Sequence, residues 1–339
     1  MKPSSLLCNA IFSATTFFVT SVFDASTLYA QTVQEQNRAM IEYLKKIHSL
    51  TPEQVKKIEE ILASSNVMSQ GNPAVTKHPM TSAACEEQRK GIAENPEFEK
   101  ICGAKHMAPL YPAGGQPSDA KACIDQFEFP NIPCSFPLVW TQANEAADIC
   151  HAMGKRLCDA HEWEGACQGD VTEPDYPFEL AANKNENDAV KAMRAAHNRK
   201  HAPAKKWSFG PAPKKGVCAM NSTKNDGCNG GDWKRCGSNT YPAGSFPDCK
   251  SSLGVYDLNG NAAEHMNLPL NKDQMASAGS RTYGVTEMKG SWFIWDKFSA
   301  HEDWCRWRAP YWHGTKLMDA KSHHNYHLSF RCCSEAAKK

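Results

Sequence analysis

Histidines near the C-terminus are the first residues whose type and spacing suggest chemistry. Five of the 13 histidines lie within residues 301–327. Two of them, His323 and His327, would share one face of a helix, and imidazole nitrogens suit Cu, Zn or Fe. This spacing predicts a transition-metal site. The alternative is a surface loop in which the histidines bind nothing, as is common for exposed histidines.

Familiar catalytic motifs are absent from the sequence. It contains no G-x-S-x-G nucleophile elbow, no Walker loop, no dinucleotide-binding G-x-G-x-x-G and no H-E-x-x-H zinc motif. The run Asp257–Asn261 begins like an EF-hand, but the sixth position is Ala262 and the twelfth is Leu268. An EF-hand needs Gly and Glu at those two positions, so we do not expect one.

Composition excludes several classes of protein. The chain has 339 residues, with 38 Lys and Arg against 37 Asp and Glu, so its net charge is +1. Such a balance provides no positive field for binding nucleic acid or an anionic membrane, and we expect no nucleic-acid partner. Nine Trp and 14 Phe argue against general disorder and predict a packed core.

The N-terminus and the cysteines predict export. Residues 1–30 resemble a cleaved signal peptide, being apolar from Leu6 to Val22 and ending in small residues before Gln31. An uncleaved membrane anchor is the alternative. Loss of Cys8 with the signal leaves 14 of the 15 cysteines, none in the C-x2-C spacing of zinc clusters. We therefore expect several disulfides in a secreted or periplasmic protein with no integral membrane span after cleavage.

The elements that must position any site divide the mature chain into parts. Residues 31–84 predict a helical N-terminal segment and linker, in which Thr51 caps a helix that starts at Pro52. The linker itself is the polar stretch 66–83. Residues 85–105 form a cysteine-containing lead-in, and 106–334 form the main domain, rich in Gly, Pro, Trp and Cys.

Two short helices are expected in the middle of the main domain. Thr141 is predicted to cap the first, which Gly154 ends. A capping box of Asp159 and Glu162 predicts the second, which runs to Cys167. The polar stretch 182–206 is expected to be a solvated excursion from the domain.

Several segments, taken in order, resemble the formylglycine-generating enzyme (sulfatase-modifying factor) family. Gly154–Cys158 followed by Glu162–Glu164 is similar to its G-K-R-L and E-W-E segment, and Gly254–Glu264 to its G-x-Y-D-x-x-G-N-x-x-E-W signature. Gly290–Trp292, Cys305–Arg306 and Ser329–Cys332 resemble its closing elements. The resemblance implies an irregular, loop-rich α+β domain of the C-type-lectin-like fold over residues 106–334. It also implies the disulfides Cys150–Cys332 and Cys167–Cys305.

The chain departs from this family where the enzymes bind copper. Their two Cu(I)-binding cysteines precede the cysteine of the C-R element in a C-x4-C-x4-C arrangement, which here corresponds to Trp295 and Ala300 before Cys305. Neither side chain can replace a soft thiolate ligand. We therefore expect a divergent member that does not generate formylglycine.

The resemblance also implies a structural calcium ion at the Asp257–Glu264 turn. In the family, positions that correspond to Asp257, Gly260, Ala262 and Glu264 supply two side-chain carboxyl or amide oxygens and two backbone carbonyls. Two carboxylates held close together would also repel each other unless a cation lay between them. A tight turn without calcium, stabilised by side-chain hydrogen bonds to nearby amides, is the alternative.

Two functions remain open at this point. The first is a binding or scaffold module for a protein, peptide or glycan outside the cytoplasm. Its expected binding surface consists of Ser291, Trp292, Trp295, Trp304 and Trp307, since aromatic side chains are good recognition anchors. These tryptophans could instead pack the core. The second function is a metal-dependent oxidoreductase that uses the C-terminal histidines.

Overall fold

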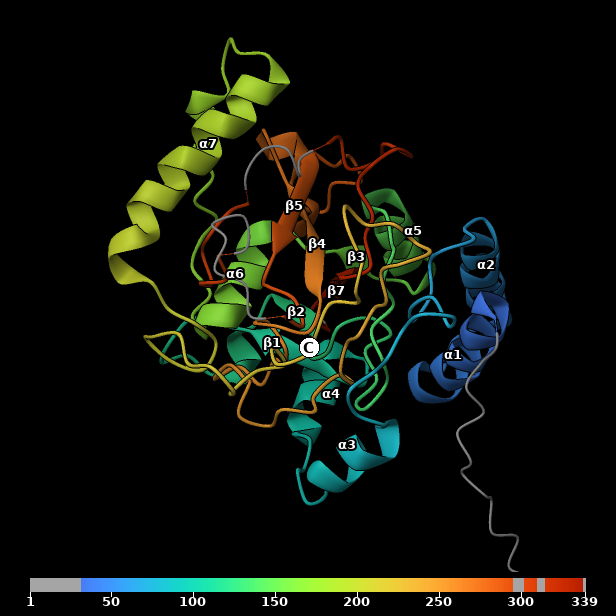
Figure 1. Ribbon diagram of the computed structural model, residues 1–339. Coiled ribbons are helices and arrows are strands. Elements are labelled where there is room, and N and C mark those ends of the chain that lie inside the picture. The colour runs from blue at the N-terminus through green and yellow to red at the C-terminus, as the bar shows by residue number, and fades with distance from the viewer. Residues whose placement is uncertain (1–31, 295–301, 310–314, 338–339) are drawn as a thin grey trace, which may run out of the picture.

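The computed structural model describes residues 32–294, 302–309 and 315–337, and they form a mixed α+β protein (Figure 1). Irregular loops connect short helices and strands. The described α-helices are α1 (Val33–His48), α2 (Pro52–Ala63), α3 (Ser82–Gln88), α4 (Pro96–Cys102), α5 (Ala143–Ala152), α6 (Ala160–Gln168) and α7 (Glu186–His201). The described strands are β1 (Met107–Leu110), β2 (Ala122–Asp125), β3 (Arg156–Leu157), β4 (Ala263–Leu268), β5 (Val285–Lys289), β6 (Leu328–Phe330) and β7 (Cys332–Glu335).

Local capping explains where several helices begin. The predicted capping boxes form at α2, with Thr51 and Gln54, and at α6, with Asp159 and Glu162. Helix α5 starts one residue later than expected. Gln142 is its N-cap in place of Thr141, and the backbone N–H of Gln142 donates to Glu145 at 2.8 Å. Each of these contacts joins a side chain to a backbone N–H three residues away, so it needs no tertiary structure.

Two small sheets lie at the centre of the molecule. The first has the order β1-β2-β7-β3, with every neighbouring pair antiparallel. The second has the order β5-β4-β6, in which β4 and β6 are parallel. Strand β7 pairs with both β2 and β3, so the C-terminal end of the chain lies inside the sheet that β1 and β2 begin.

The N-terminal helices belong to the main core. Leu44 of α1 and Ile58 of α2 are buried in one cluster with Ala146 of α5 and Phe330 of β6. The stretch that the sequence predicts as a linker also lies against the domain, where Met68 is fully buried. This stretch of polar sequence is ordered because side chains such as Asn72 bind backbone groups more than 100 residues away.

Residues 182–206 differ most from the sequence expectation. Instead of a solvated excursion they form α7, which Asn185 caps and which buries Met193, Arg194 and His197. Figure 1 shows α7 along one side of the molecule and α1 with α2 along the other, with the sheets between them. The polar composition misled the prediction because the buried face of α7 is narrow and includes Arg194 and His197 beside its apolar residues.

Seven disulfides use all fourteen cysteines from Cys85 to Cys333. The bonds are Cys85–Cys134, Cys102–Cys123, Cys150–Cys332, Cys158–Cys333, Cys167–Cys305, Cys218–Cys249 and Cys228–Cys236. Cys150–Cys332 and Cys167–Cys305 are the two pairs that the family resemblance implies. So many bonds are typical of a protein that folds in an oxidising compartment. None of the helices in the described ranges is long and apolar enough to cross a membrane.

Candidate functional site

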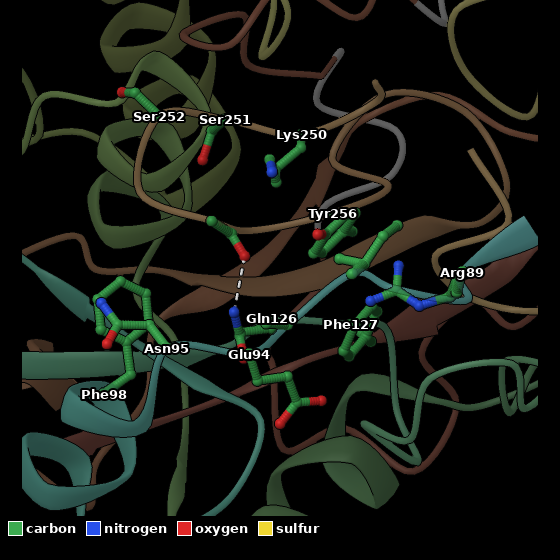
Figure 2. Close-up of a pocket in the computed structure, with 13 residues that line it drawn as sticks. Arg89, Glu94, Asn95, Phe98, Gln126, Phe127, Lys250, Ser251, Ser252 and Tyr256 are labelled. Carbon is green, nitrogen blue, oxygen red and sulfur yellow. Dashed lines mark hydrogen bonds between the residues drawn. The ribbon is translucent and has the colours of Figure 1, made fainter. Parts of the chain in front are cut away.

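A cavity of about 260 Å³ lies where α4, the end of β2 and the loop 250–256 meet (Figure 2). Its wall combines cationic, aromatic, amide and hydroxyl groups. The side chains that Figure 2 labels are Arg89, Glu94, Asn95, Phe98, Gln126, Phe127, Lys250, Ser251, Ser252 and Tyr256.

The cations of this cavity are held over aromatic rings. The guanidinium of Arg89 lies 4.9 Å from the ring centroid of Phe127 and 4.6 Å from that of Tyr256. Its Nη1 also donates to the carbonyl of Gly244 at 3.0 Å. The ammonium of Lys250 lies 5.6 Å from the Tyr256 ring. Arg89 is therefore fixed in place, whereas Lys250 is on an exposed stem.

The one acidic group on this wall already has a partner. Glu94 lies 2.7 Å from Nδ1 of His106. That hydrogen bond lowers the pKa of Glu94 and outweighs the opposite effect of its partial burial. Gln126 donates one amide hydrogen to the carbonyl of Gly254 at 2.9 Å. The cavity thus keeps its positive character at neutral pH.

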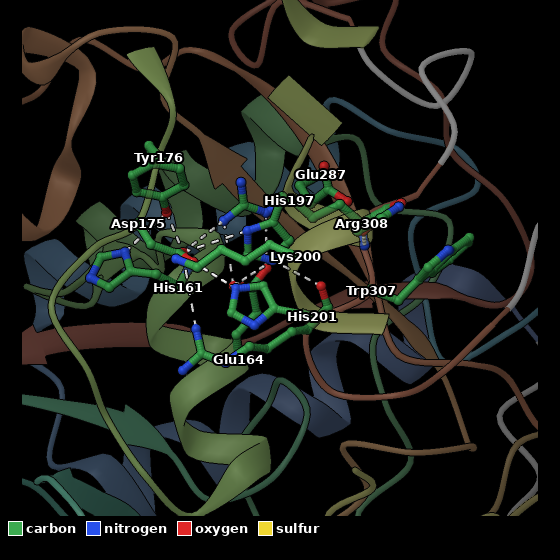
Figure 3. A network of polar contacts seen from close by, with 12 residues as sticks. His161, Glu164, Asp175, Tyr176, His197, Lys200, His201, Glu287, Trp307 and Arg308 are labelled. Carbon is green, nitrogen blue, oxygen red and sulfur yellow. Dashed lines mark hydrogen bonds and ion pairs between the residues drawn. The ribbon is translucent and has the colours of Figure 1, made fainter. Parts of the chain in front are cut away.

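A second polar cluster lies beside α7 (Figure 3). Asp175, His197 and His201 place one ligand atom each within 4.8 Å of one another, and no other such group of three occurs within the described ranges. Nε2 of His201 lies 2.6 Å from Oδ2 of Asp175, and Nδ1 of His197 lies 3.5 Å from Oδ1. The carboxylate of Asp175 therefore sits between the two imidazoles.

Sequence reasoning missed this cluster, although part of it was visible. His197 and His201 are four residues apart, the spacing that puts two side chains on one face of a helix. The expectation of a solvated excursion removed the helix from consideration. Asp175 precedes α7 on an irregular loop, and no local pattern connects it with the two histidines.

His197 is fully enclosed and uncharged at neutral pH. Burial lowers its pKa to about 3, and the neighbouring Arg308 and Lys289 add to that effect against the attraction of Glu164 and Asp175. Its Nε2 lies 2.9 Å from the carbonyl oxygen of Arg306.

Cations outnumber carboxylates around the cluster. Lys200 lies 2.9 Å from Oδ2 of Asp175, and Arg308 lies 3.7 Å from Oδ1. Glu164 binds Arg308 at 3.0 Å and Lys289 at 3.1 Å. Burial alone would raise the pKa of Asp175, but the histidines and Lys200 outweigh it and the net direction is downward. Asp175 is therefore a carboxylate at neutral pH.

The turn predicted to bind calcium is buried and partly neutralised by the protein itself. Both carboxylate oxygens of Glu264 accept from Arg331 at 2.6 Å, and one also accepts from the indole of Trp163 at 3.0 Å. The sequence argument required an added cation between Asp257 and Glu264. For Glu264, the guanidinium of Arg331 fills that role.

The carboxylate of Asp257 has fewer hydrogen-bond partners than that of Glu264. Its Oδ2 accepts from the backbone N–H of Gly244 at 2.5 Å, while Oδ1 is buried and makes no hydrogen bond within the described structure. Burial raises the pKa of Asp257 to about 6. Glu128, which accepts from the backbone N–H of Ala262 at 2.7 Å, also has a pKa well above its usual value because of burial and the nearby Asp257 and Glu264. Calcium binding by Asp257, Gly260, Ala262 and Glu264 stays a prediction.

The predicted aromatic binding surface is not a surface. Trp292, Trp304 and Trp307 are all less than 10% exposed and lie in two apolar clusters. Ser291 is also buried, and its hydroxyl accepts from Gly260 and donates to Asp303. Trp295 lies outside the described residues. Packing within these two clusters accounts for the three tryptophans.

The predicted pair His323 and His327 does not share a helical face. Residues 322–325 are irregular, a turn follows at 326–327 and β6 begins at Leu328. His323 is exposed, whereas His327 is buried with its ring 4.4 Å from that of Trp292. The prediction of a shared helical face was therefore wrong, because the two histidines lie in irregular structure and a turn that lead into β6.

Comparisons with known proteins provide no family assignment. No protein-family model matches the chain, and no curated protein matches it. Among solved structures, the crystal structure of CarF matches with a TM-score of 0.36 and 11% identity, over 68% of this chain and 97% of that chain. This similarity is too low to assign a fold or a function.

Proposed function

We propose that this protein is an exported binding module, secreted or periplasmic, that holds an acidic sugar residue of a glycan in the cavity of Figure 2. The observation that carries the proposal is the fixed guanidinium of Arg89 beside Lys250, with the only acidic group on that wall already bound to His106. Two cations against one carboxylate, which already faces His106, leave a net positive wall that favours a carboxylate or sulfate ligand.

The remaining lining suits a sugar. Asn95, Gln126, Ser251 and Ser252 bring amide and hydroxyl groups to the same wall. Such groups hydrogen-bond to sugar hydroxyls, while the charged group of the ligand would lie against Arg89. The cavity volume of about 260 Å³ is enough for a single monosaccharide unit. The seven disulfides support the extracytoplasmic part of the proposal.

For the scaffold we propose a divergent member of the formylglycine-generating enzyme family with a C-type-lectin-like fold. The support is the ordered series of sequence segments, together with the bonds Cys150–Cys332 and Cys167–Cys305. The absence of cysteine at positions 295 and 300 favours binding over copper-dependent oxidation.

A glycan array that includes sulfated and uronic-acid sugars tests the proposal. We expect the protein to bind acidic glycans. Lys250→Ala and Arg89→Ala should each weaken that binding by about tenfold or more, because each removes a charge-assisted hydrogen bond to the ligand. Lys214→Ala is the matched control, since it removes one exposed lysine outside this cavity. Binding of neutral and acidic glycans alike, or an equal effect of Lys214→Ala, would contradict the proposal. Selective binding of acidic peptides instead of glycans would also overturn it.

A further inference from the structure

We propose that Asp175, His197 and His201 bind one divalent transition-metal ion, with Zn²⁺ as the best match to two imidazole nitrogens and one carboxylate. This site is separate from the proposed glycan cavity and does not depend on it. It also differs from the predicted histidine pair near the C-terminus.

Hydrogen-bond directions at His197 are the first argument. A carbonyl oxygen can only accept, so Nε2 of His197 carries the hydrogen that it donates to Arg306. Nδ1 is then the ring nitrogen that can bind a metal ion, and it faces Oδ1 of Asp175 at 3.5 Å. Both atoms are buried, and neither has a hydrogen-bond partner in the described structure.

A cation between these two buried atoms would satisfy both of them. Zn²⁺ binds nitrogen and oxygen at about 2.0–2.2 Å, so two of its ligands in a tetrahedron are about 3.4 Å apart. The observed separation of 3.5 Å is close to that value. The carbonyl of Arg306 also fixes the ring of His197, as second-shell acceptors commonly do for metal-binding histidines.

His201 supplies the third ligand from the next turn of α7. The ring centroids of His197 and His201 are 4.5 Å apart, and Nε2 of His201 forms a direct hydrogen bond to Asp175 at 2.6 Å. A metal ion would replace the hydrogen of this bond, and the two atoms would move apart to about 3.4 Å. The side chains of Asp175 and His201 remain 16% and 19% exposed. Three protein ligands beside a partly open edge leave room for a water or another ligand on the metal.

The surrounding cations oppose a metal ion, and the protein offsets only part of their charge. Glu164 binds both Arg308 and Lys289. Arg306 donates to Gln168 and Thr172 and reaches Asp175 only at 4.0 Å. Lys200 contacts Asp175 directly, but its side chain is 61% exposed and can turn into solvent. A metal ion would therefore compete mainly with Lys200.

The test uses the mature, untagged protein, stripped of metal with a chelator and titrated with Co²⁺ and then Zn²⁺. We expect one Co²⁺ per chain, seen by its visible absorption, and displacement by Zn²⁺. Asp175→Asn and His201→Ala are each expected to lower the affinity by about 100-fold. Lys200→Met is expected to raise it several-fold, a gain that a purely structural role of the cluster would not produce.

His323→Ala is the matched control, because it removes an exposed histidine near the C-terminus. If His201→Ala does not fold by circular dichroism, His201→Gln and Lys200→Met decide the question. Failure of the wild-type protein to bind Co²⁺ stoichiometrically would overturn the proposal. Loss of binding in His323→Ala with retention in Asp175→Asn would also overturn it.

Discussion

Replacing Asp257 by Asn should stabilise the protein at neutral pH when calcium is removed. Burial raises the pKa of Asp257 from 3.8 to about 6. A carboxyl group whose pKa is raised in the folded state does not lower the free energy of unfolding below pH 3.8, because it is protonated in both the folded and the unfolded state. Between pH 3.8 and 6 the folded state still holds the proton that the unfolded state has released, so stability falls as the pH rises. Above pH 6 the carboxylate is charged in both states, and the free energy of unfolding is lowered by the full amount.

The magnitude follows from the same two values. At about 1.4 kcal/mol per pKa unit, the difference corresponds to about 3 kcal/mol at pH 7.5, as an upper limit. An Asn side chain removes the charge and retains an oxygen for the Gly244 N–H. It also suits the backbone, since Asp257 has φ of 56° and Asn is well tolerated in that region. The net stabilisation should therefore lie at or below this limit.

Urea unfolding in EDTA at pH 7.5 and at pH 4 measures the effect. We expect Asp257→Asn to be more stable than the wild type at pH 7.5 and nearly equal to it at pH 4. Asp226→Asn is the control, because Asp226 is exposed and its substitution should change stability by less than about 0.5 kcal/mol. A destabilised Asp257→Asn at pH 7.5 in EDTA, or the same difference at both pH values, would refute the reasoning.

Calcium is expected to reverse the order of stability of the wild type and Asp257→Asn. If the turn binds Ca²⁺ as the family resemblance implies, adding calcium stabilises the wild type by neutralising Asp257, while Asp257→Asn gains much less. Titrating CaCl₂ into both proteins and following the midpoint of thermal unfolding separates the two cases. If calcium leaves the midpoint of thermal unfolding of the wild type unchanged, the turn does not bind calcium.

Three further outcomes are expected. Arg331→Met should lower the free energy of unfolding in urea by about 3–5 kcal/mol, because Glu264 is left buried without its partner; adding Glu264→Gln should recover part of that loss, and full additivity would contradict the pairing. Gly260→Ala should lower the thermal midpoint by the equivalent of about 1–3 kcal/mol, since φ is 85° and a Cβ would lie 2.9 Å from the carbonyl oxygen of Ala219. Gly91→Ala, with the same φ and open space, should cost less, and equal losses would show that the close approach to Ala219 is unimportant. Incubation with copper and a Cys-x-Pro-x-Arg peptide should leave the peptide mass unchanged, and a formylglycine product would overturn the binding-module proposal.

The sequence determined the features that depend on neighbours along the chain. The capping boxes at Thr51 and Asp159 were visible because each joins residues three apart. Disulfide bonding, which is typical of an oxidising compartment, followed from the number and spacing of the cysteines. The start of α5 was misplaced by one residue because two adjacent polar residues can both act as caps, and only the Gln142–Glu145 contact decides between them.

Tertiary structure alone decided which of the reactive residues come together. Asp175 meets His201 from 26 positions away in the sequence, and Arg331 reaches Glu264 across 67. Trp292, Trp304 and Trp307, which were predicted to belong to a recognition surface, are buried because they pack in two apolar clusters of the core. Helical and capping patterns report which face of a short segment is apolar. They do not predict which distant residues pack against that face. For this reason α7 and its histidines were missed.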